Sequence, residues 1–355
     1  MGGVQTSRGA LAPPGYALLS WQGWRVLLHR RAWAAGAALL ILLLAAGSAI
    51  LAAGSEGLTP WSALRAAWGQ GDPMHVFLVQ ALRLPRIAAA LLSGFAFGVA
   101  GCLLQTLTGN RLATPGVIGL DNGATAFAVA SIVAVPASLA PPAMALMGAA
   151  TAAALAFGLG GGSGTRGYRF VVVGIGVGAV FAALTNLMLA RTGIDAANQA
   201  YPWTVGSLNA RPASAVWILA AGLALAFPWA KYLARRLDPM RFSEAVAKGL
   251  GVPVARTRAA TLAAAVLLSA LSVSVAGPVG LVALAAPEAA RYLCGRRGVP
   301  IATSGLAGAM LMLGADWAGR TWFAPIEIPV GVVTAVVGGP YLLWILLRRP
   351  ARHSL

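Results

Sequence analysis

Long apolar runs separated by short polar segments dominate the chain. A membrane-spanning helix needs roughly 20 apolar residues, and most of the runs have about this length. The pattern therefore predicts an all-α polytopic membrane protein whose spans fill most of the 355 residues. We expect ten transmembrane helices, at 32–53, 86–107, 113–135, 142–160, 170–191, 213–233, 259–278, 280–294, 301–318 and 328–347.

The basic residues lie between the apolar runs, mostly in every second gap. An even number of spans places both termini on one side of the membrane. With both termini in the cytoplasm, most of the 26 lysines and arginines fall inside, as the positive-inside rule requires. We therefore expect a multi-pass protein of the bacterial inner (cytoplasmic) membrane. The arginines left outside are Arg65, Arg83, Arg86, Arg191, Arg211 and Arg320.

The domain organisation follows from the same pattern. Residues 1–31 form a cytoplasmic N-terminal segment, residues 32–347 a single transmembrane domain, and residues 348–355 a cytoplasmic tail. The longest polar segment inside, 231–258, is a cytoplasmic loop. We expect a short helix within it, from Ser243 to Lys248, that docks onto a soluble partner; a basic anchor loop is the alternative.

Two interruptions divide the predicted spans. Pro115 and several glycines break 110–123, and Gly277-Pro278 breaks the chain again. The segment before each break is similar, AALLSGFAFGVAG at 89–101 and AVLLSALSVSVAG at 265–277. The spacing of about half the chain predicts two inverted five-helix halves, with some helices short or broken, as in many transporters. Chance similarity in an apolar sequence is the alternative.

Composition excludes several other classes of protein. Only 10% of residues are charged and 59% are hydrophobic, which a soluble globular domain does not combine. The net charge of +17 is spread over many short loops instead of one face, so we expect no nucleic-acid partner. Cys102 and Cys294 imply packing residues and no disulfide framework. Gly94 and Gly98 have the spacing of close helix packing.

No enzymatic or metal site is expected in this chain. A nucleotide-binding P-loop needs a lysine within Gly-x-x-x-x-Gly-Lys-Ser/Thr, and neither Lys231 nor Lys248 has this context. The histidines His29, His75 and His353 are isolated, so the sequence predicts no metal site. We expect no catalytic residues and no cofactor bound by the chain itself.

Carboxylates within or near the spans need a partner or a function. Glu288 and Arg291 lie three residues apart, and Asp316 and Arg320 lie four apart, so each pair can meet on one helical face. Internal ion pairs are one interpretation. The alternative is an ion-gradient-driven secondary transporter that uses intramembrane carboxylates for coupling.

A set of motifs in fixed order resembles a known family. The motifs are RLPR at 83–86, GCLLQTLTGNRLATPGVIGLDNGA at 101–124, Trp203 with Gly206-Ser207-Leu208, KGLGVPVARTR at 248–258, AGPVGLVALAAPEAAR at 276–291, ADWAGR at 315–320, and EIPVG at 327–331 followed by GGPYLLWILL. From about Leu82 onward the chain resembles the FecCD-type permeases, membrane subunits of ABC importers for iron-siderophores, haem and vitamin B12.

The resemblance implies a permease subunit that pairs with a second one, in a homodimer or a close heterodimer, with the translocation pathway at their interface. Two cytoplasmic ABC ATPase subunits would bind ATP and Mg. A periplasmic or lipid-anchored substrate-binding protein would dock outside. Among the cargoes of the family, ferric siderophores are the commonest, which favours an iron chelate here.

The resemblance also implies roles for individual residues. Arg83, Arg86 and Arg320 match arginines that receive acidic residues of the binding protein. Glu244, Gly249, Gly251 and Arg256 match the segment that couples to the ATPase, and Asn110 and Leu112 match the cytoplasmic gate. At two positions the chain departs from the family: Arg111 stands where proline is usual, which implies a less rigid gate loop, and Glu288 stands where histidine is usual.

Overall fold

The computed structural model describes residues 16–21, 24–53, 59–133, 140–160, 168–295 and 298–347. Residues 1–15 of the predicted N-terminal segment and the whole predicted tail 348–355 lie outside the described residues. The described part of the N-terminal segment contains an antiparallel hairpin of β1 (Tyr16–Trp21) and β2 (Trp24–His29), which the sequence pattern did not predict.

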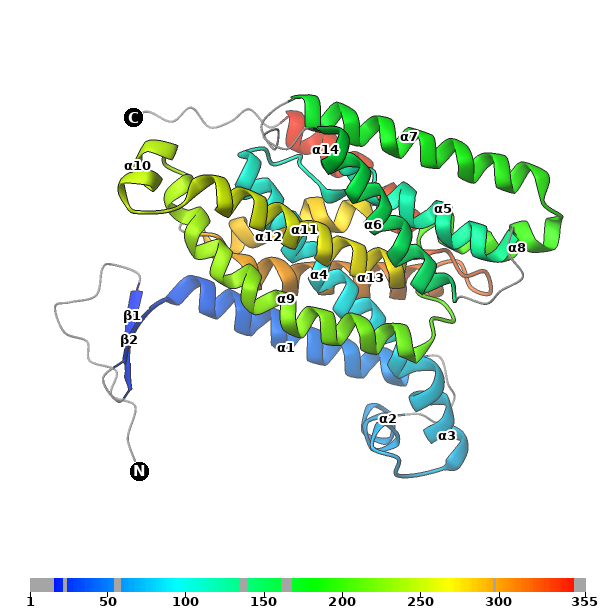
Figure 1. Cartoon of the computed structure of the whole chain (residues 1–355). Coiled ribbons are helices and arrows are strands. Elements are labelled where there is room, and N and C mark those ends of the chain that lie inside the picture. The colour runs from blue at the N-terminus through cyan, green and yellow to red at the C-terminus, as the bar shows by residue number, and fades with distance from the viewer. Residues whose placement is uncertain are drawn as a thin grey trace.

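Helices occupy all ten positions at which spans were predicted (Figure 1). Within the described residues, seven are long and apolar enough to cross a membrane, and α5 and the apolar part of α14 are shorter. The number of crossings therefore stays a prediction. The ten helices are α1 (Arg30–Ala52), α4 (Leu84–Thr108), α5 (Leu120–Val133), α6 (Pro141–Gly160), α7 (Tyr168–Arg191), α9 (Ala213–Met240), α11 (Val254–Ala276), α12 (Gly280–Cys294), α13 (Ile301–Thr321) and α14 (Val330–Leu347).

Short helices lie at the two ends of the bundle. We call the end that holds the start of α4 and the end of α13 the arginine end, and the end that holds the start of α5 and the end of α9 the loop end. In Figure 1 the arginine end is on the right, beside α8, and the loop end is on the left, beside α10. The short helices are α2 (Pro60–Ala67), α3 (Pro73–Phe77), the π-helix η1 (Leu78–Arg83), the 3-10 helix η2 (Pro115–Ile118), α8 (Ile194–Val205) and α10 (Glu244–Gly249).

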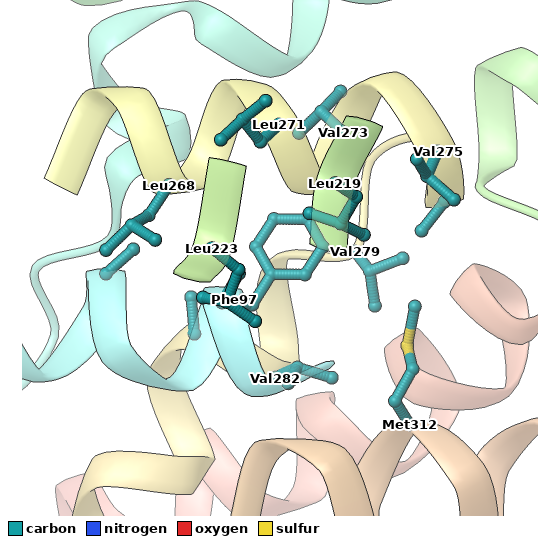
Figure 2. Close-up of a cluster of buried hydrophobic side chains, with 14 of the residues drawn as sticks. Phe97, Leu219, Leu223, Leu268, Leu271, Val273, Val275, Val279, Val282 and Met312 are labelled. Atoms are coloured by element: carbon teal, nitrogen blue, oxygen red, sulfur yellow. The ribbon is translucent and has the colours of Figure 1, made fainter. Parts of the chain in front are cut away.

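Helix α4 lies in the interior and packs closely against α11, α12 and α13. The faces of Gly94 and Gly98 touch the backbone of α13 at Gly308 and Ser304, so the predicted small-residue packing is confirmed. Around this contact, Figure 2 shows an apolar cluster drawn from several helices, including Phe97 of α4 and Met312 of α13. Close backbone approach strengthens the dispersion contacts between these helices, which lipid cannot replace.

The two predicted breaks are confirmed. Helix α4 stops at Thr108, and Gly109 takes the left-handed conformation with φ of 66°. Helix α11 stops at Ala276, and Gly277 has φ of 74°. In both places the chain resumes as a shorter helix, α5 or α12. The third span was predicted to begin at 113, which is wrong, because Pro115 and Gly119 confine 115–118 to a 3-10 turn and α5 begins only at Leu120.

The arrangement of the helices agrees with two inverted halves. Helices α4 and α11, which carry the similar segments, are each the second long helix of their half and pack against each other. The packing between the halves is also equivalent. The second long helix of each half packs on the fourth of the other, α4 on α13 and α11 on α6. A hydrogen bond from Ser272 Oγ to the Ser93 carbonyl, at 3.1 Å, also joins the two similar segments.

The predicted cytoplasmic loop 231–258 is shorter than expected. Helix α9 continues through ten of its residues to Met240, because KYLARRL is a strong helix-forming sequence and Pro239 lies only at its last turn. Helix α11 likewise begins at Val254, ahead of the predicted 259. The predicted short helix is confirmed as α10: the Ser243 side chain accepts a hydrogen bond from the Val246 amide at 3.1 Å, and Gly251 follows with φ of 76°.

Candidate functional site

At the arginine end, a buried carboxylate gathers two of the predicted docking arginines. Asp316 on α13 is only 3% exposed, and its oxygens lie 3.0 Å from Arg86 Nη2 and 3.2 Å from Arg320 Nε. The predicted i,i+4 pair of Asp316 and Arg320 is therefore confirmed. Glu327 adds a second anion, 3.0 Å from Arg86 Nη1. An ion pair between residues 230 positions apart, Arg86 and Asp316, thus joins the start of α4 to the end of α13.

The pairing with Asp316 holds two of the predicted docking arginines in place. The side chains of Arg86 and Arg320 remain 16% and 22% exposed, so part of each reaches the surface. The third, Arg83, donates a hydrogen bond to the Leu51 carbonyl at the end of α1. All three line one cavity of about 320 Å³. The structure brings the three arginines together at one end of the bundle, and their docking role stays a prediction.

A fourth arginine of this end, Arg211, has a different environment. Its guanidinium lies 3.7 Å above the Trp203 ring, and its Nε donates to the Ser207 carbonyl at 3.0 Å. Trp203 was recognised as a motif residue, whereas Arg211 was assigned only to the outer loops. Burial lowers the pKa of Arg211 to about 10, so the side chain stays charged at neutral pH.

At the loop end, the predicted gate residues form a hydrogen-bonded turn. The Asn110 side chain accepts from the Leu112 amide at 2.9 Å, and the Asn110 amide donates to Thr108 Oγ1 at 3.2 Å. Asparagine favours such turns because its short side chain can replace a backbone acceptor. These bonds restrain the loop at the position where the family proline is absent.

The two residues that depart from the family pattern lie side by side. Arg111 Nη1 is 3.1 Å from Glu288 Oε1, and the other oxygen of Glu288 is 3.2 Å from Arg291 Nε. The second contact confirms the predicted i,i+3 pair, whereas the first, which joins the gate loop to α12, was missed. Arg291 also donates to Gln105, whose amide donates to the Leu284 carbonyl at 3.2 Å. A charge network therefore ties the gate loop to the broken helix α12.

We expect the Arg111–Glu288 contact to restrain the gate loop through charge. Glu288→Gln and Arg111→Gln should each raise hydrogen exchange of the 109–114 amides by about threefold, because an exposed pair contributes about 0.5 kcal/mol. The double variant with Arg111→Gln and Glu288→Gln should exchange no faster than Glu288→Gln alone, because both substitutions remove the same contact. Arg191→Gln, an exposed arginine at the opposite end, is the control. Additive effects of the two substitutions would show that the two side chains act independently.

The predicted coupling segment meets the gate at a shared cavity. A cavity of about 580 Å³ at the loop end is lined by Asn110 and Leu112 of the gate loop and by Glu244 at the start of α10. Glu244 also pairs with Arg258 of α11. Gly249 ends α10 and Gly251 lies in the turn that follows, both exposed, and Arg256 is exposed in the first turn of α11. The sequence predicted a gate and a coupling segment, and in the structure Glu244 of the second adjoins Asn110 and Leu112 of the first.

The described residues contain no group of three or more histidine, cysteine, aspartate or glutamate side chains placed to hold a metal ion. Both cysteines in this part of the chain are buried and unpaired with each other. Their packing fits the sequence interpretation: Cys294 lies 3.3 Å from Thr303 Oγ1 across the α12–α13 turn.

Helices long enough to span a bilayer, with breaks after α4 and α11 and a charge network at the loop end, indicate a multi-pass membrane transport protein. Comparison with known proteins names the family. The model of the FecCD transport family matches residues 38–348, and the chain belongs to that family.

Curated relatives match this chain over most of its length and most of their own. The achromobactin transport system permease protein CbrC of Dickeya dadantii is 35% identical over 88% of the chain and 90% of its own length. The Fe(3+) dicitrate transport system permease protein FecD of Escherichia coli is 33% identical over 87% of the chain and 98% of its own length. The ferric enterobactin permease FepG of the same species is 32% identical over 87% of the chain.

A solved structure supports the fold. An ABC transporter assigned to the metal-chelate type, in an inward-facing conformation, superposes with a TM-score of 0.76 over 90% of this chain and 100% of its own. At 24% identity this likeness concerns the fold alone. The family and fold resemblance expected from the motifs is thereby confirmed, and the chain is a permease of an ABC transport family.

Proposed function

We propose that this chain is the membrane subunit of an ATP-driven importer for a ferric siderophore. The observation that carries the proposal is the shared cavity at the loop end, where the gate loop and α10 meet. A push on α10 by a soluble partner would reach Asn110 and Leu112 through this cavity and the Glu244–Arg258 pair. Relatives named for achromobactin, ferric dicitrate and ferric enterobactin support the cargo class.

Helix α10 has the surface that such a partner needs. Phe242, Val246 and Leu250 are 84%, 45% and 67% exposed around it, at an end rich in basic residues. Exposed apolar side chains rimmed by charge are typical of protein interfaces. We infer that each of two ATPases, which bind ATP and Mg, receives one α10 in a cleft on its cytoplasmic face. ATP binding then favours one gate state by binding that state more tightly.

We expect Glu244→Ala to uncouple hydrolysis from uptake. Loss of the Arg258 contact detaches α10 from α11, and a coupling loss of about 1.4 kcal/mol lowers uptake per ATP about tenfold. Gly251→Val should act alike, because a β-branched residue resists the positive φ at this position. The measurement is siderophore uptake and phosphate release by the reconstituted complex. Asp195→Ala removes an exposed acid from the other end and is the control; equal uptake per ATP in all variants would place coupling elsewhere.

The arginine end is the proposed docking surface for a periplasmic or lipid-anchored binding protein. With the basic loop end in the cytoplasm, Arg83, Arg86 and Arg320 face outward, and their exposed edges can accept carboxylates from a partner. We expect reversal of all three to weaken binding of that protein, measured at moderate salt. Because Arg86 and Arg320 also hold Asp316, folding of the variant must be checked by its unfolding midpoint. Unchanged affinity in a folded variant would contradict this assignment.

A secondary transporter driven by ions is less well supported. Its coupling carboxylates would need to bind and release a cation, yet Glu288 and Asp316 each lie within 3.3 Å of two arginines. A transported cation would have to compete with these guanidinium groups for the carboxylate oxygens. We further propose that two copies of the permease form the pathway between them, because α7 exposes apolar side chains such as Ile175 and Val180 along its length.

A further inference from the structure

Two cavities adjoin at the arginine end and share an unusual cation. The first, of about 320 Å³, and the second, of about 460 Å³, are both lined by Arg86, Asn209, Arg211 and Glu327. The second continues along Tyr201, Trp203 and Ser207. Its volume falls within the range of small-molecule sites, and its lining mixes an aromatic ring with charged and amide groups.

Arg211 lacks a carboxylate partner among the described residues. Arg86 and Arg320 are paired with Asp316, whereas the one hydrogen-bond acceptor of Arg211 within the described ranges is the Ser207 carbonyl. Its Nη2 is buried and donates no hydrogen bond within the described residues. A buried charged donor without an acceptor is costly, so it indicates a group that is satisfied by a ligand.

The loop that carries Arg211 is held in place at an energetic cost. Ala210 has φ of 51°, a left-handed conformation that a residue with a side chain rarely adopts. The Ser207 hydroxyl accepts from the Asn209 amide at 3.2 Å, and the Trp203 ring supports the guanidinium from below. Strained backbone tends to persist where a side chain must be positioned for function.

The charges around the cavities favour an anion. Among the described residues here, the guanidinium groups of Arg86, Arg211 and Arg320 outnumber the carboxylates of Asp316 and Glu327 by one. Guanidinium groups bind carboxylates through paired, charge-assisted hydrogen bonds. We propose that Arg211, on Trp203, is a carboxylate-binding subsite at the outer mouth of the pathway, which selects iron chelates with free carboxylates, such as ferric citrate, over neutral ones. This inference rests on the proposed function for its cargo and its orientation.

The test is direct binding to the full-length permease in lipid nanodiscs, without ATPase, ATP or binding protein. The probes are ferric dicitrate, an anion, and a ferric trihydroxamate, which is neutral. We expect Arg211→Gln to raise the Kd for ferric dicitrate about tenfold or more, as loss of one charge-assisted contact does. Binding of the trihydroxamate should not change. Arg191→Gln, which removes an exposed arginine from the same end, should leave both affinities unchanged.

One further variant and a stability measurement separate a binding role from a structural one. Arg211→Lys keeps the charge and should retain part of the discrimination between the two chelates. Arg211→Gln loses the Ser207 hydrogen bond and the Trp203 contact but also removes a buried charge, so its unfolding temperature should stay close to the native one. Ferric dicitrate should raise the unfolding temperature of the native protein alone. Equal affinity of native protein and Arg211→Gln for ferric dicitrate overturns the proposal. So does an Arg211→Gln variant that loses only affinity for the binding protein, which would make Arg211 a docking residue.

The experiments distinguish failure of the subsite proposal from failure of the proposed function. If the complete complex fails to take up any ferric chelate with ATP, the proposed function fails, while the nanodisc affinities still report on the subsite. If uptake proceeds and Arg211→Gln leaves the KM for ferric dicitrate unchanged, the subsite proposal alone fails.

Discussion

Asp316→Asn should lower the free energy of unfolding by about 3 kcal/mol, the low end of the range for breaking a buried ion pair. The carboxylate is 3% exposed and is the common partner of Arg86 and Arg320. Asparagine keeps its shape and removes its charge, so two guanidinium groups lose the anion that compensates their burial. Denaturant unfolding of the purified protein in detergent measures the change.

Glu327→Gln is the matched control for Asp316→Asn. Glu327 also contacts Arg86 at 3.0 Å, but it is 47% exposed, and an exposed pair contributes about 0.5 kcal/mol. The same loss of one negative charge should therefore cost far less at this position. Similar losses for the two variants would mean that Asp316 is not the organising charge of the arginine end.

Gly101→Ala should lower the free energy of unfolding by about 2–3 kcal/mol, a typical cost of overpacking. A Cβ at Gly101 would collide with the carbonyl oxygen of Ala283 and would lie 3.0 Å from the Ala283 Cα. These atoms belong to the backbone of α12, so no side chain can turn aside. Helices α4 and α12 would have to separate, and with them the gate loop that follows α4. The measurement is again denaturant unfolding in detergent.

Gly47→Ala is the matched control for Gly101→Ala and should not lower the free energy of unfolding. Gly47 lies in α1, and a Cβ there would meet no atom within 4 Å. Since alanine is favoured over glycine in a helix by about 1 kcal/mol, this substitution should leave stability unchanged or raise it. A loss in both variants would show that glycine flexibility, and not the close approach of α4 and α12, accounts for the effect.

The positions of the ten main helices could be predicted because apolar length is a local property. The breaks at Pro115 and Gly277 were equally local, since each depends on a residue that a helix does not tolerate. Ion pairs within one helix, such as Glu288 with Arg291, followed from spacing alone. The short helix α10 was predicted from the glycines at its end, Gly249 and Gly251.

Contacts between distant segments could not be predicted in this way. The Arg86–Asp316 and Arg111–Glu288 pairs join residues 230 and 177 positions apart, and only the packing of α4 against α13 and α12 brings them together. Helix boundaries at α9 and α11 were misplaced because charged residues at the membrane surface are compatible with a continuing helix. The sequence pointed to Arg211 only through its position eight residues after Trp203. That its Nη2 has no hydrogen-bond acceptor among the described residues is visible only in the structure.

The central claim is that energy spent in a neighbouring ATPase works the gates of this chain. Uptake of a ferric siderophore into proteoliposomes tests it most directly, with and without the ATPase subunits and with and without an ion gradient. The account predicts uptake only when the ATPase and ATP are present, whatever the gradient. Uptake driven by a gradient through the permease alone would contradict it.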